Sequence, residues 1–272
     1  MRGFHVRFPP KLWDFQRFGL TPEKLWPRLI RRGIPRIFVT SIPKAGTHLV
    51  ERALCLHPAL YRKLLPKLTD DNLSRFGGFE AVLSSLKPGQ VLLAHLYYTP
   101  DRDRLLQELG IPGVFVIRDP RDIVVSDTFF ILGWKGHPLH EAFRKQPNLE
   151  ACLRLAIQGL PRLNYPSIEE KLRRFSGWLE SSLQVIRFED LVGPAGGGVE
   201  EVQRANLERL FRSLGIHLDS GRLEKIRKKL FFQKSPTFRR GAIGQWKKHF
   251  TPEIEKLFWD TAGRWMETYG YA

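Results

Sequence analysis

The stretch that decides the fold is residues 36–49, which read Arg36-Ile37-Phe38-Val39-Thr40-Ser41-Ile42-Pro43-Lys44-Ala45-Gly46-Thr47-His48-Leu49. Residues 36–40 form a mainly apolar, β-branched run without alternation, as in a strand that has helices on both faces. The residues that follow include a proline, a lysine and a glycine, and residues 47–56 then show helical periodicity. A strand, a tight loop and a helix in this order predict an α/β fold.

The loop between this strand and this helix is a candidate anion site. Backbone N–H groups and the positive end of the helix dipole point at the loop, and Lys44 adds a full charge. The loop differs from that of the nucleotide triphosphatases, because the G-x-x-x-x-G-K-[ST] spacing is absent. Its shortness suits a single phosphate that carries one transferable group. The alternative for this motif alone is a lysine with a purely structural role in a strand–helix turn.

Three more apolar runs predict parallel strands at residues 91–95, 114–117 and 184–188. Helical patterns lie near residues 47–56, 70–86, 121–131, 139–158, 166–181, 199–213, 219–230 and 251–268. Strands that alternate with helices indicate an α/β fold with right-handed crossovers. Ligands in such folds bind at the carboxyl ends of the strands, so the residues that end these runs are the functional candidates.

The third strand ends in a basic motif, Arg118-Asp119-Pro120-Arg121-Asp122-Ile123-Val124-Val125-Ser126. Asp119 is expected to cap the next helix, with Pro120 at its first position. An arginine at a buried strand end is costly without an anionic partner, so Arg118 needs one from the protein or from a ligand. Together with Ser126 it could bind a second phosphate.

Another basic motif lies near the C-terminus and reads Arg239-Arg240-Gly241-Ala242-Ile243-Gly244-Gln245-Trp246-Lys247-Lys248-His249-Phe250-Thr251. Two adjacent arginines before Gly241 form a turn whose backbone can approach a phosphate closely. Taken alone, this segment is equally compatible with a solvated loop.

The chain of 272 residues has a formal net charge of +16, which favours polyanionic ligands such as nucleic acid, anionic lipid or a highly phosphorylated small molecule. No apolar run reaches the roughly 18 residues of a membrane span, so no transmembrane segment is expected. Cys55 and Cys152 are the only cysteines, which favours a reducing cytoplasm and leaves one disulfide between them open. Residues 1–35 are predicted to form a basic extension packed on one domain of residues 36–272.

The three motifs, in this order and spacing, resemble those of the PAPS-dependent sulfotransferases of the cytosolic type and their bacterial relatives. The family's P-K-[SA]-G-T loop matches Pro43 to Thr47, its R-[ND]-P-[KR]-D-x-x-V-S motif matches Arg118 to Ser126, and its C-terminal nucleotide motif matches Arg239 to Thr251. The resemblance covers roughly residues 36–268. It implies a P-loop-like, three-layer α/β sandwich with a central parallel sheet flanked by helices.

The resemblance also implies an activity. The sulfuryl group of PAPS (3′-phosphoadenosine 5′-phosphosulfate) would move to a hydroxyl or amine of an acceptor, with PAP as the other product and no metal required. His95 would be the general base, because it ends the second strand and a neutral imidazole can take the acceptor's proton. Lys44 would contact the bridging oxygen and the transferred group.

The remaining implied roles concern the two phosphates and the base of the donor. The loop residues Ala45, Gly46 and Thr47 would hold the 5′-phosphate, and His48 could donate to it. The 3′-phosphate would be bound by Arg118, Ser126, Arg239 and Gly241, assisted by Arg240. Phe188 would lie near the adenine.

The chain departs from the family's pattern at several positions. The family often has Lys-Thr before the catalytic histidine, where this chain has Leu93-Ala94. His48-Leu49 replaces the common Thr-Trp, which removes an adenine-stacking tryptophan, and Gln245 stands in place of the commoner aspartate. The animal members' dimer motif is broken by Pro252 and Lys256, so the oligomeric state is left open.

Two other functions are compatible with parts of the sequence. A nucleotide-kinase-like phosphotransferase would need Mg²⁺, a longer phosphate loop and a Walker-B aspartate, which the first and third strands do not offer. A non-catalytic binder of nucleic acid or nucleotide would use the basic regions and show steep salt dependence, and it is disfavoured by the three motifs.

The acceptor is expected to be a small molecule, apolar or aromatic. Candidate aromatic residues for its pocket lie in three regions: Trp13, Phe15 and Trp26; Tyr97 and Tyr98; and Phe129 to Trp134. The alternative is that these aromatic residues belong to the hydrophobic core. The basic extension also allows contact with a membrane surface or an anionic acceptor.

Overall fold

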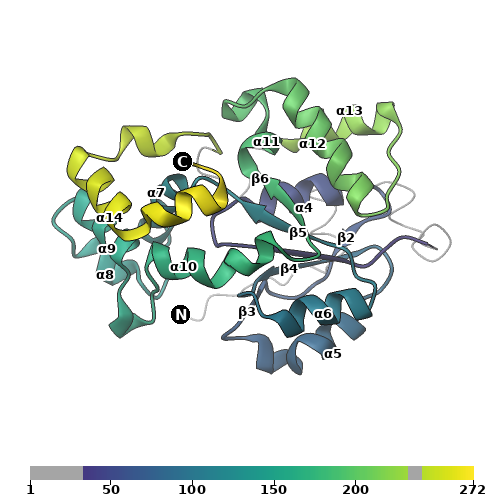
Figure 1. Ribbon diagram of the computed structural model, residues 1–272, viewed down its shortest axis with the longest axis horizontal. Coiled ribbons are helices and arrows are strands. Elements are labelled where there is room, and N and C mark those ends of the chain that lie inside the picture. Colours follow the sequence, from purple (N-terminus) through teal and green to yellow (C-terminus); the bar gives the residue numbers. More distant parts are fainter. Residues whose placement is uncertain (1–32, 232–240) are drawn as a thin grey trace, which may run out of the picture.

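The computed structural model describes residues 33–231 and 241–272 (Figure 1). Its six-stranded sheet has the spatial order β2–β4–β1–β5–β6, with β3 also paired to β4, and every pairing is parallel. The strands are β1 (Ile37–Ser41), β2 (Tyr61–Arg62), β3 (Leu68–Thr69), β4 (Gln90–His95), β5 (Gly113–Ile117) and β6 (Gln184–Arg187). The four strands predicted from the sequence are β1, β4, β5 and β6.

The α-helices of the described residues connect and cover these strands. They are α4 (Thr47–Cys55), α5 (Gly78–Ser84), α6 (Pro100–Glu108), α7 (Pro120–Gly133), α8 (His140–Arg144), α9 (Leu149–Gln158), α10 (Ile168–Phe175), α11 (Phe188–Val192), α12 (Glu200–Ser213), α13 (Ser220–Leu230) and α14 (Pro252–Tyr269). Short 3-10 turns are η1 (Leu73–Phe76), η2 (Pro161–Leu163), η3 (Ser176–Leu179), η4 (Pro194–Gly196) and η5 (Gln245–Lys248).

Alternate residues of each strand feed two separate cores, one on each face of the sheet. Phe38 and Phe115 belong to the core that α5, α6 and α10 cover, whereas Val39 and Val116 belong to the core under α4, α12 and α13. In Figure 1, α4, α12 and α13 lie above the sheet, and α5 and α6 lie below it. Because both faces are covered, the strands read as continuous apolar runs, and the predicted three-layer α/β sandwich is confirmed.

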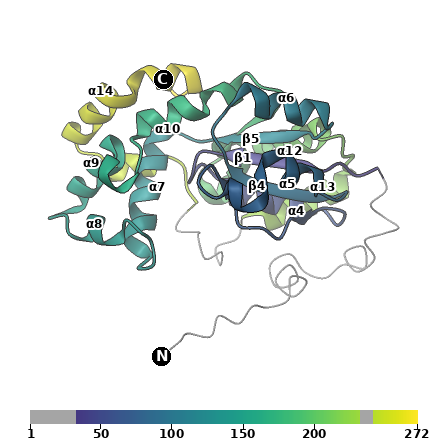
Figure 2. The ribbon, with the colours of Figure 1, turned by 90° about the horizontal axis from the view of Figure 1, so that it is seen from below.

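A group of helices extends beyond the carboxyl ends of the strands. Helix α7 leads away from β5 and packs on α8 and α9, and α14 packs on α9 and α10. Figure 2 shows this group as a lobe beside the sheet. The carboxyl ends of β1, β4 and β5 therefore face a junction between the sheet and the lobe.

Two helices expected from the sequence are interrupted in the structure. The prediction of one helix over residues 139–158 is wrong, because Pro147 lacks a backbone N–H and disfavours helix before it, and Asn148 starts α9 by accepting from Ala151 N at 2.9 Å. The prediction of one helix over residues 70–86 is also wrong. Gly77 and Gly78 have φ of 81° and 88° there, which separates η1 from α5.

The question of a disulfide is settled by the two cores. Cys55 is buried in the core under α4 and Cys152 in the core on the other face, so no disulfide joins them. Among the helices of residues 33–231 and 241–272, none has the length and hydrophobicity needed to cross a bilayer. The predicted extension of residues 1–35 lies almost wholly outside the described residues, so the division at residue 36 stays a prediction.

Candidate active site

A cavity of about 650 Å³ opens at the carboxyl ends of β1, β4 and β5. The predicted site residues that line it are Lys44, Gly46, Thr47, His48, His95, Arg118, Ser126, Phe188 and Gly241. Ala45 is not a lining residue, because its side chain is buried in the core. Arg239 and Arg240 lie outside the described residues. The cavity thus joins segments from the first, second and third predicted motifs and from the end of β4.

The backbone of the loop after β1 has two unusual conformations. Lys44 has φ of 72°, which is costly for a residue with a side chain, and Gly46 has φ of 112°. A Cβ on Gly46 would lie 2.8 Å from Cδ2 of Phe188, so only glycine fits against that ring. Gly46 precedes α4 without a side-chain cap, so the helix start presents backbone N–H groups to the cavity. The start of α4 therefore lies at the cavity, where the sequence predicts an anion site.

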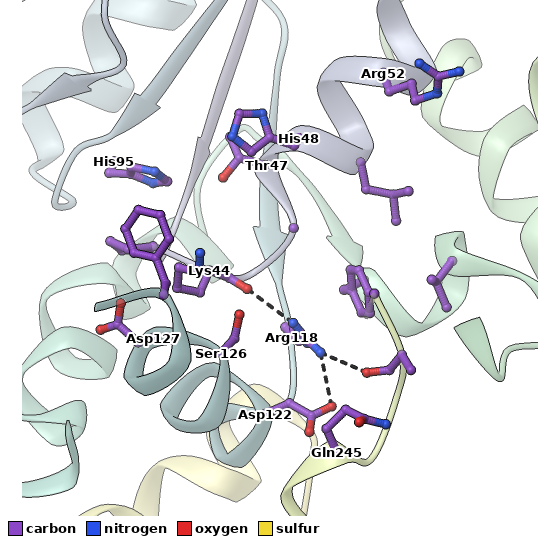
Figure 3. Close-up of a pocket in the computed structure, with 18 of the residues that line it drawn as sticks. Lys44, Thr47, His48, Arg52, His95, Arg118, Asp122, Ser126, Asp127 and Gln245 are labelled. Carbon is purple, nitrogen blue, oxygen red and sulfur yellow. Dashed lines mark hydrogen bonds and ion pairs between the residues drawn. The ribbon is translucent and has the colours of Figure 1, made fainter. Parts of the chain in front are cut away.

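Lys44 extends from this loop over an aromatic ring of α7. Its Nζ lies 3.7 Å from the centre of the Phe130 ring, a distance at which the ring face attracts an ammonium group. In Figure 3 the amine points toward the space between His95 and Thr47. Phe130 therefore positions a positive charge beside the end of β4.

His95 ends β4, and its Nδ1 lies 2.8 Å from the carbonyl oxygen of Ser41. A carbonyl only accepts, so Nδ1 carries the proton and Nε2 keeps its lone pair. Burial, and next the charge of Lys67, lower the pKa of His95 to about 3, although the hydrogen bond to Ser41 works in the opposite direction. The imidazole is thus neutral, with Nε2 able to accept a proton.

Arg118 lies directly after β5 and is 8% exposed. Its guanidinium stacks on the Phe188 ring at 4.3 Å and donates to the carbonyl of Ala242 at 2.9 Å, with longer contacts to Asp122 (3.4 Å) and Lys44 O (3.5 Å) (Figure 3). Its Nε is buried and has no hydrogen-bond partner among the described residues. A buried donor without a partner costs stability, so this atom indicates a place for an anionic ligand.

The acidic residues of the same motif hold the site together. Asp119 caps α7 as predicted, accepting from Arg121 N at 2.9 Å, and Pro120 is the first residue of the helix. Asp122 accepts from Gly244 N and Trp246 N, both at 2.9 Å. The carboxylate of Asp122 therefore fixes the C-terminal segment, including Gly241, against the start of α7. One turn further along α7, Ser126 faces the cavity (Figure 3).

An aromatic wall continues along α7. Phe130, Trp134 and His137 contact one another, with ring centres 5.4 to 5.7 Å apart, and all three line the cavity. Phe130 and Trp134 were expected near the acceptor, whereas Tyr97 and Tyr98 pack on the core instead. The aromatic residues of the N-terminal extension lie outside the described residues.

Several polar residues of the cavity were missed in the sequence, among them Asp127, Lys67 and Thr69. Asp127, on α7, accepts from Tyr165 Oη at 2.8 Å and from Lys171 Nζ at 3.0 Å. Burial raises the pKa of Asp127, but the charge of Lys171 and the hydrogen bonds from Tyr165 and Lys171 together outweigh it, so the pKa lies below its ordinary value. Thr69 reaches the cavity from β3 and Lys67 from the residue directly before it, and this strand is too short to give a sequence pattern.

An apolar end of the cavity lies near Phe188. Its lining residues there are Leu49, Val192, Leu230 and Phe231. They come from α4, α11 and the end of α13, so this end is formed by the helices on one face of the sheet. In the described part of the chain, no cluster of three or more His, Cys, Asp or Glu residues is arranged to bind a metal ion.

Comparison with known families identifies the class of protein. The sulfotransferase domain family matches residues 35–270, nearly the whole chain, so this chain belongs to the sulfotransferase family. A comparison with curated protein sequences found no match.

Solved structures with the same fold include a sulfotransferase and a retinol dehydratase. The mouse sulfotransferase SULT7A1 complexed with PAP is 19% identical, with a TM-score of 0.63 over 85% of this chain and 84% of that chain. Retinol dehydratase in complex with androsterone and inactive cofactor PAP is 14% identical, with a TM-score of 0.58 over 96% and 85%. Its complex with retinol and PAP is 15% identical, with a TM-score of 0.59 over 88% and 83%. At these identities the likeness shows the fold.

Proposed function

We propose that this sulfotransferase uses PAPS as its donor and transfers the sulfuryl group to a hydroxyl or amine of an apolar small molecule. The observation that carries the proposal is that Lys44, His95 and Arg118, which come from three different strand ends, line one cavity with the start of α4. The PAP in the structures of similar fold supports the choice of donor. Membership of the family favours this activity over a kinase-like or nucleic-acid-binding function.

Two separate anion sites fit the two phosphates of the donor. The backbone at Gly46 and Thr47, with the dipole of α4, would hold the 5′-phosphate. Arg118, Ser126 and Gly241 would hold the 3′-phosphate, which would supply the missing partner of Arg118 Nε. The Phe188 ring and the apolar residues beyond it would accommodate the adenine. Arg239 and Arg240 are assigned to the 3′-phosphate by sequence alone.

His95 and Lys44 would carry the chemistry. His95 Nε2 accepts the acceptor's proton while the new bond from the acceptor oxygen or nitrogen to sulfur forms. The bond between sulfur and the bridging oxygen breaks, and its electron pair stays on the 5′-phosphate, next to the Lys44 ammonium. The products are a sulfate ester or sulfamate and PAP, and His95 then releases its proton to water. Most of the rate comes from positioning and electrostatics.

The aromatic wall supports an apolar acceptor. Phe130 lies under the Lys44 amine and contacts Trp134, and His95 lines the same cavity, so a ring stacked on Phe130 would bring a hydroxyl toward the reacting end of the cavity. Androsterone and retinol, in the retinol dehydratase complexes, are ligands of this apolar kind. Contact with a membrane surface and a cytoplasmic location stay predictions.

Calorimetry tests the donor assignment. PAP should bind tightly without metal, because its two phosphates match two preformed cationic sites, and ATP with Mg²⁺ should bind at least tenfold more weakly. His95→Gln should keep PAP affinity within about twofold while transfer to a simple phenol, 4-nitrophenol, falls about 100-fold or more. Preference for MgATP would overturn the proposal. A large loss of PAP affinity in His95→Gln would mean that His95 serves the nucleotide site.

A further inference from the structure

A lysine reaches the cavity from the strand beside His95. Strand β3 pairs with β4 so that Leu68 lies next to Ala94 and Thr69 next to His95. Lys67 directly precedes β3, and continuing the same register one residue back would set it opposite Leu93. Side chains at matching positions of parallel neighbours project from the same face of a sheet. Lys67 therefore projects from the face on which Leu93 packs under α4.

Position 93 is where the sulfotransferase family often has a lysine. In this chain Leu93 is buried in the core and cannot supply a charge. Lys67 brings an ammonium group to the same face of the sheet from one strand further out, and it lines the cavity. Lys67, directly before the neighbouring strand β3, thus supplies the positive charge that β4 lacks at position 93.

A hydrogen-bonded chain fixes the position of Lys67. Its Nζ lies 3.0 Å from Nε2 of His48, and Nδ1 of His48 lies 2.8 Å from a carboxylate oxygen of Glu51. An ammonium only donates, so Nε2 of His48 accepts and Nδ1–H donates to Glu51. Glu51 is fully buried and also pairs with Arg62 at 3.4 Å. The imidazole of His48 therefore positions Lys67, while its backbone N–H belongs to the start of α4.

Lys67 also lies close to the reacting end of the cavity. Its charge is, after burial, the largest influence that lowers the pKa of His95, ahead of His48 and Lys44. An acceptor whose hydroxyl or amine is hydrogen-bonded to Nε2 of His95 receives the sulfuryl group close to this histidine. A negatively charged sulfuryl group there lies in the field of both Lys44 and Lys67.

We propose that Lys67 is a further catalytic residue, which binds the non-bridging oxygens of the sulfuryl group during transfer. His48 and Glu51 are its positioning residues. The inference rests on the proposed function, because it assumes that PAPS is the donor.

Binding of PAPS and PAP tests this role without an acceptor, because the two ligands differ only in the sulfuryl group. Lys67→Met keeps the length of the side chain and removes its charge. PAPS affinity should fall about tenfold more than PAP affinity, since a charge-assisted hydrogen bond to the sulfuryl group is lost. Isothermal titration calorimetry measures both affinities. Lys63→Met is the matched control, because Lys63 lies before the same strand but bonds to Ser85 at the surface, and both affinities should stay unchanged.

The outcomes separate the two proposals. If the native chain binds neither PAP nor PAPS, the proposed function fails. If it binds both and Lys67→Met leaves both affinities unchanged, only the role of Lys67 fails, and a lysine that recognises an anionic acceptor becomes the better explanation. An equal loss for both ligands would assign Lys67 to the nucleotide and also overturn the proposal.

A lysine placed at position 93 of β4 should compensate for the loss of Lys67. In the Lys67→Met background, Leu93→Lys should restore the ratio of PAPS to PAP affinity to within about threefold of the native value. Circular dichroism checks that this core substitution folds. If the double variant does not fold, Lys67→Arg is the test. This variant keeps the charge, so its ratio of PAPS to PAP affinity should stay within about threefold of the native value. A tenfold loss would contradict the proposal.

Discussion

Ser41 determines which nitrogen of His95 can accept a proton, because its carbonyl oxygen lies 2.8 Å from Nδ1 and can only accept a hydrogen bond. The same burial that fixes this ring also keeps it neutral, with a pKa of about 3 in the folded protein. An unfolded chain returns the histidine to its ordinary pKa of about 6.5. Between these two values the unfolded state binds more protons, so stability is full above about pH 6.5 and falls as the pH is lowered.

This difference predicts a pH-dependent loss of stability. At pH 5, which lies above the folded-state pKa, His95 should cost about 2 kcal/mol of unfolding free energy relative to pH 8. Urea unfolding of the native chain and of His95→Gln at pH 5 and pH 8 measures this loss. Between the two pH values the native chain should lose about 2 kcal/mol more than the variant. His217→Gln is the control, since this side chain is exposed. An equal loss in the native chain and His95→Gln would show that His95 titrates normally.

Among the elements, the contact between α7 and the C-terminal segment depends on one carboxylate. Asp122 is almost fully buried and accepts from Gly244 N, Trp246 N and the Arg118 guanidinium. These bonds hold Gly241 and Arg118 on the same side of the cavity. A change at Asp122 should therefore alter both the stability of the fold and the geometry of the proposed 3′-phosphate site.

Asp122→Asn should lower the unfolding free energy by about 2 kcal/mol, because an amide nitrogen cannot accept one of the backbone N–H groups. PAP affinity should fall about tenfold as Gly241 and Arg118 lose their fixed positions. Denaturant unfolding and calorimetry measure the two effects. Asp260→Asn removes an exposed ion pair with Lys256 and should change neither by more than about 0.5 kcal/mol. A stability loss without loss of PAP affinity would separate this contact from the ligand site.

The elements that the sequence predicts well are those with long, regular signals. The strand and loop of residues 36–46 have an uninterrupted apolar run followed by turn residues, and Asp119-Pro120 is a strong helix start. Strand β3, which directly follows Lys67, has only two residues, so no periodicity indicates it, and its place beside β4 depends on pairing across the sheet. Helix α6 was also missed, although Thr99 and Pro100 form a normal start.

At the scale of the whole molecule, the sequence predicts which motifs converge but not what lies between them. Lys44, Arg118 and His95 meet because parallel strands end at one edge of a sheet. The sequence named Phe129 to Trp134 as pocket candidates, but helix periodicity alone does not show which face of α7 meets the cavity, so it did not separate Phe130 and Trp134 from Phe129. The sequence around Asp122 does not show that its carboxylate binds backbone N–H groups more than 100 residues further along the chain.

The net charge of +16 attracts anions to the whole molecule, and this attraction should depend on salt more strongly than binding in the cavity does. Long-range attraction between exposed charges is strongly screened by salt, whereas a phosphate beside a buried arginine is screened much less. PAP affinity should therefore fall by less than about tenfold between 50 and 200 mM KCl. Over the same salt range, binding of a 20-base-pair DNA duplex to exposed lysines and arginines should fall by about 1,000-fold or more, as for a protein that makes six or more phosphate contacts. Calorimetry for PAP and fluorescence anisotropy for the duplex measure the two slopes. A PAP slope as steep as that of DNA would place the nucleotide on the exposed basic surface and not in the cavity.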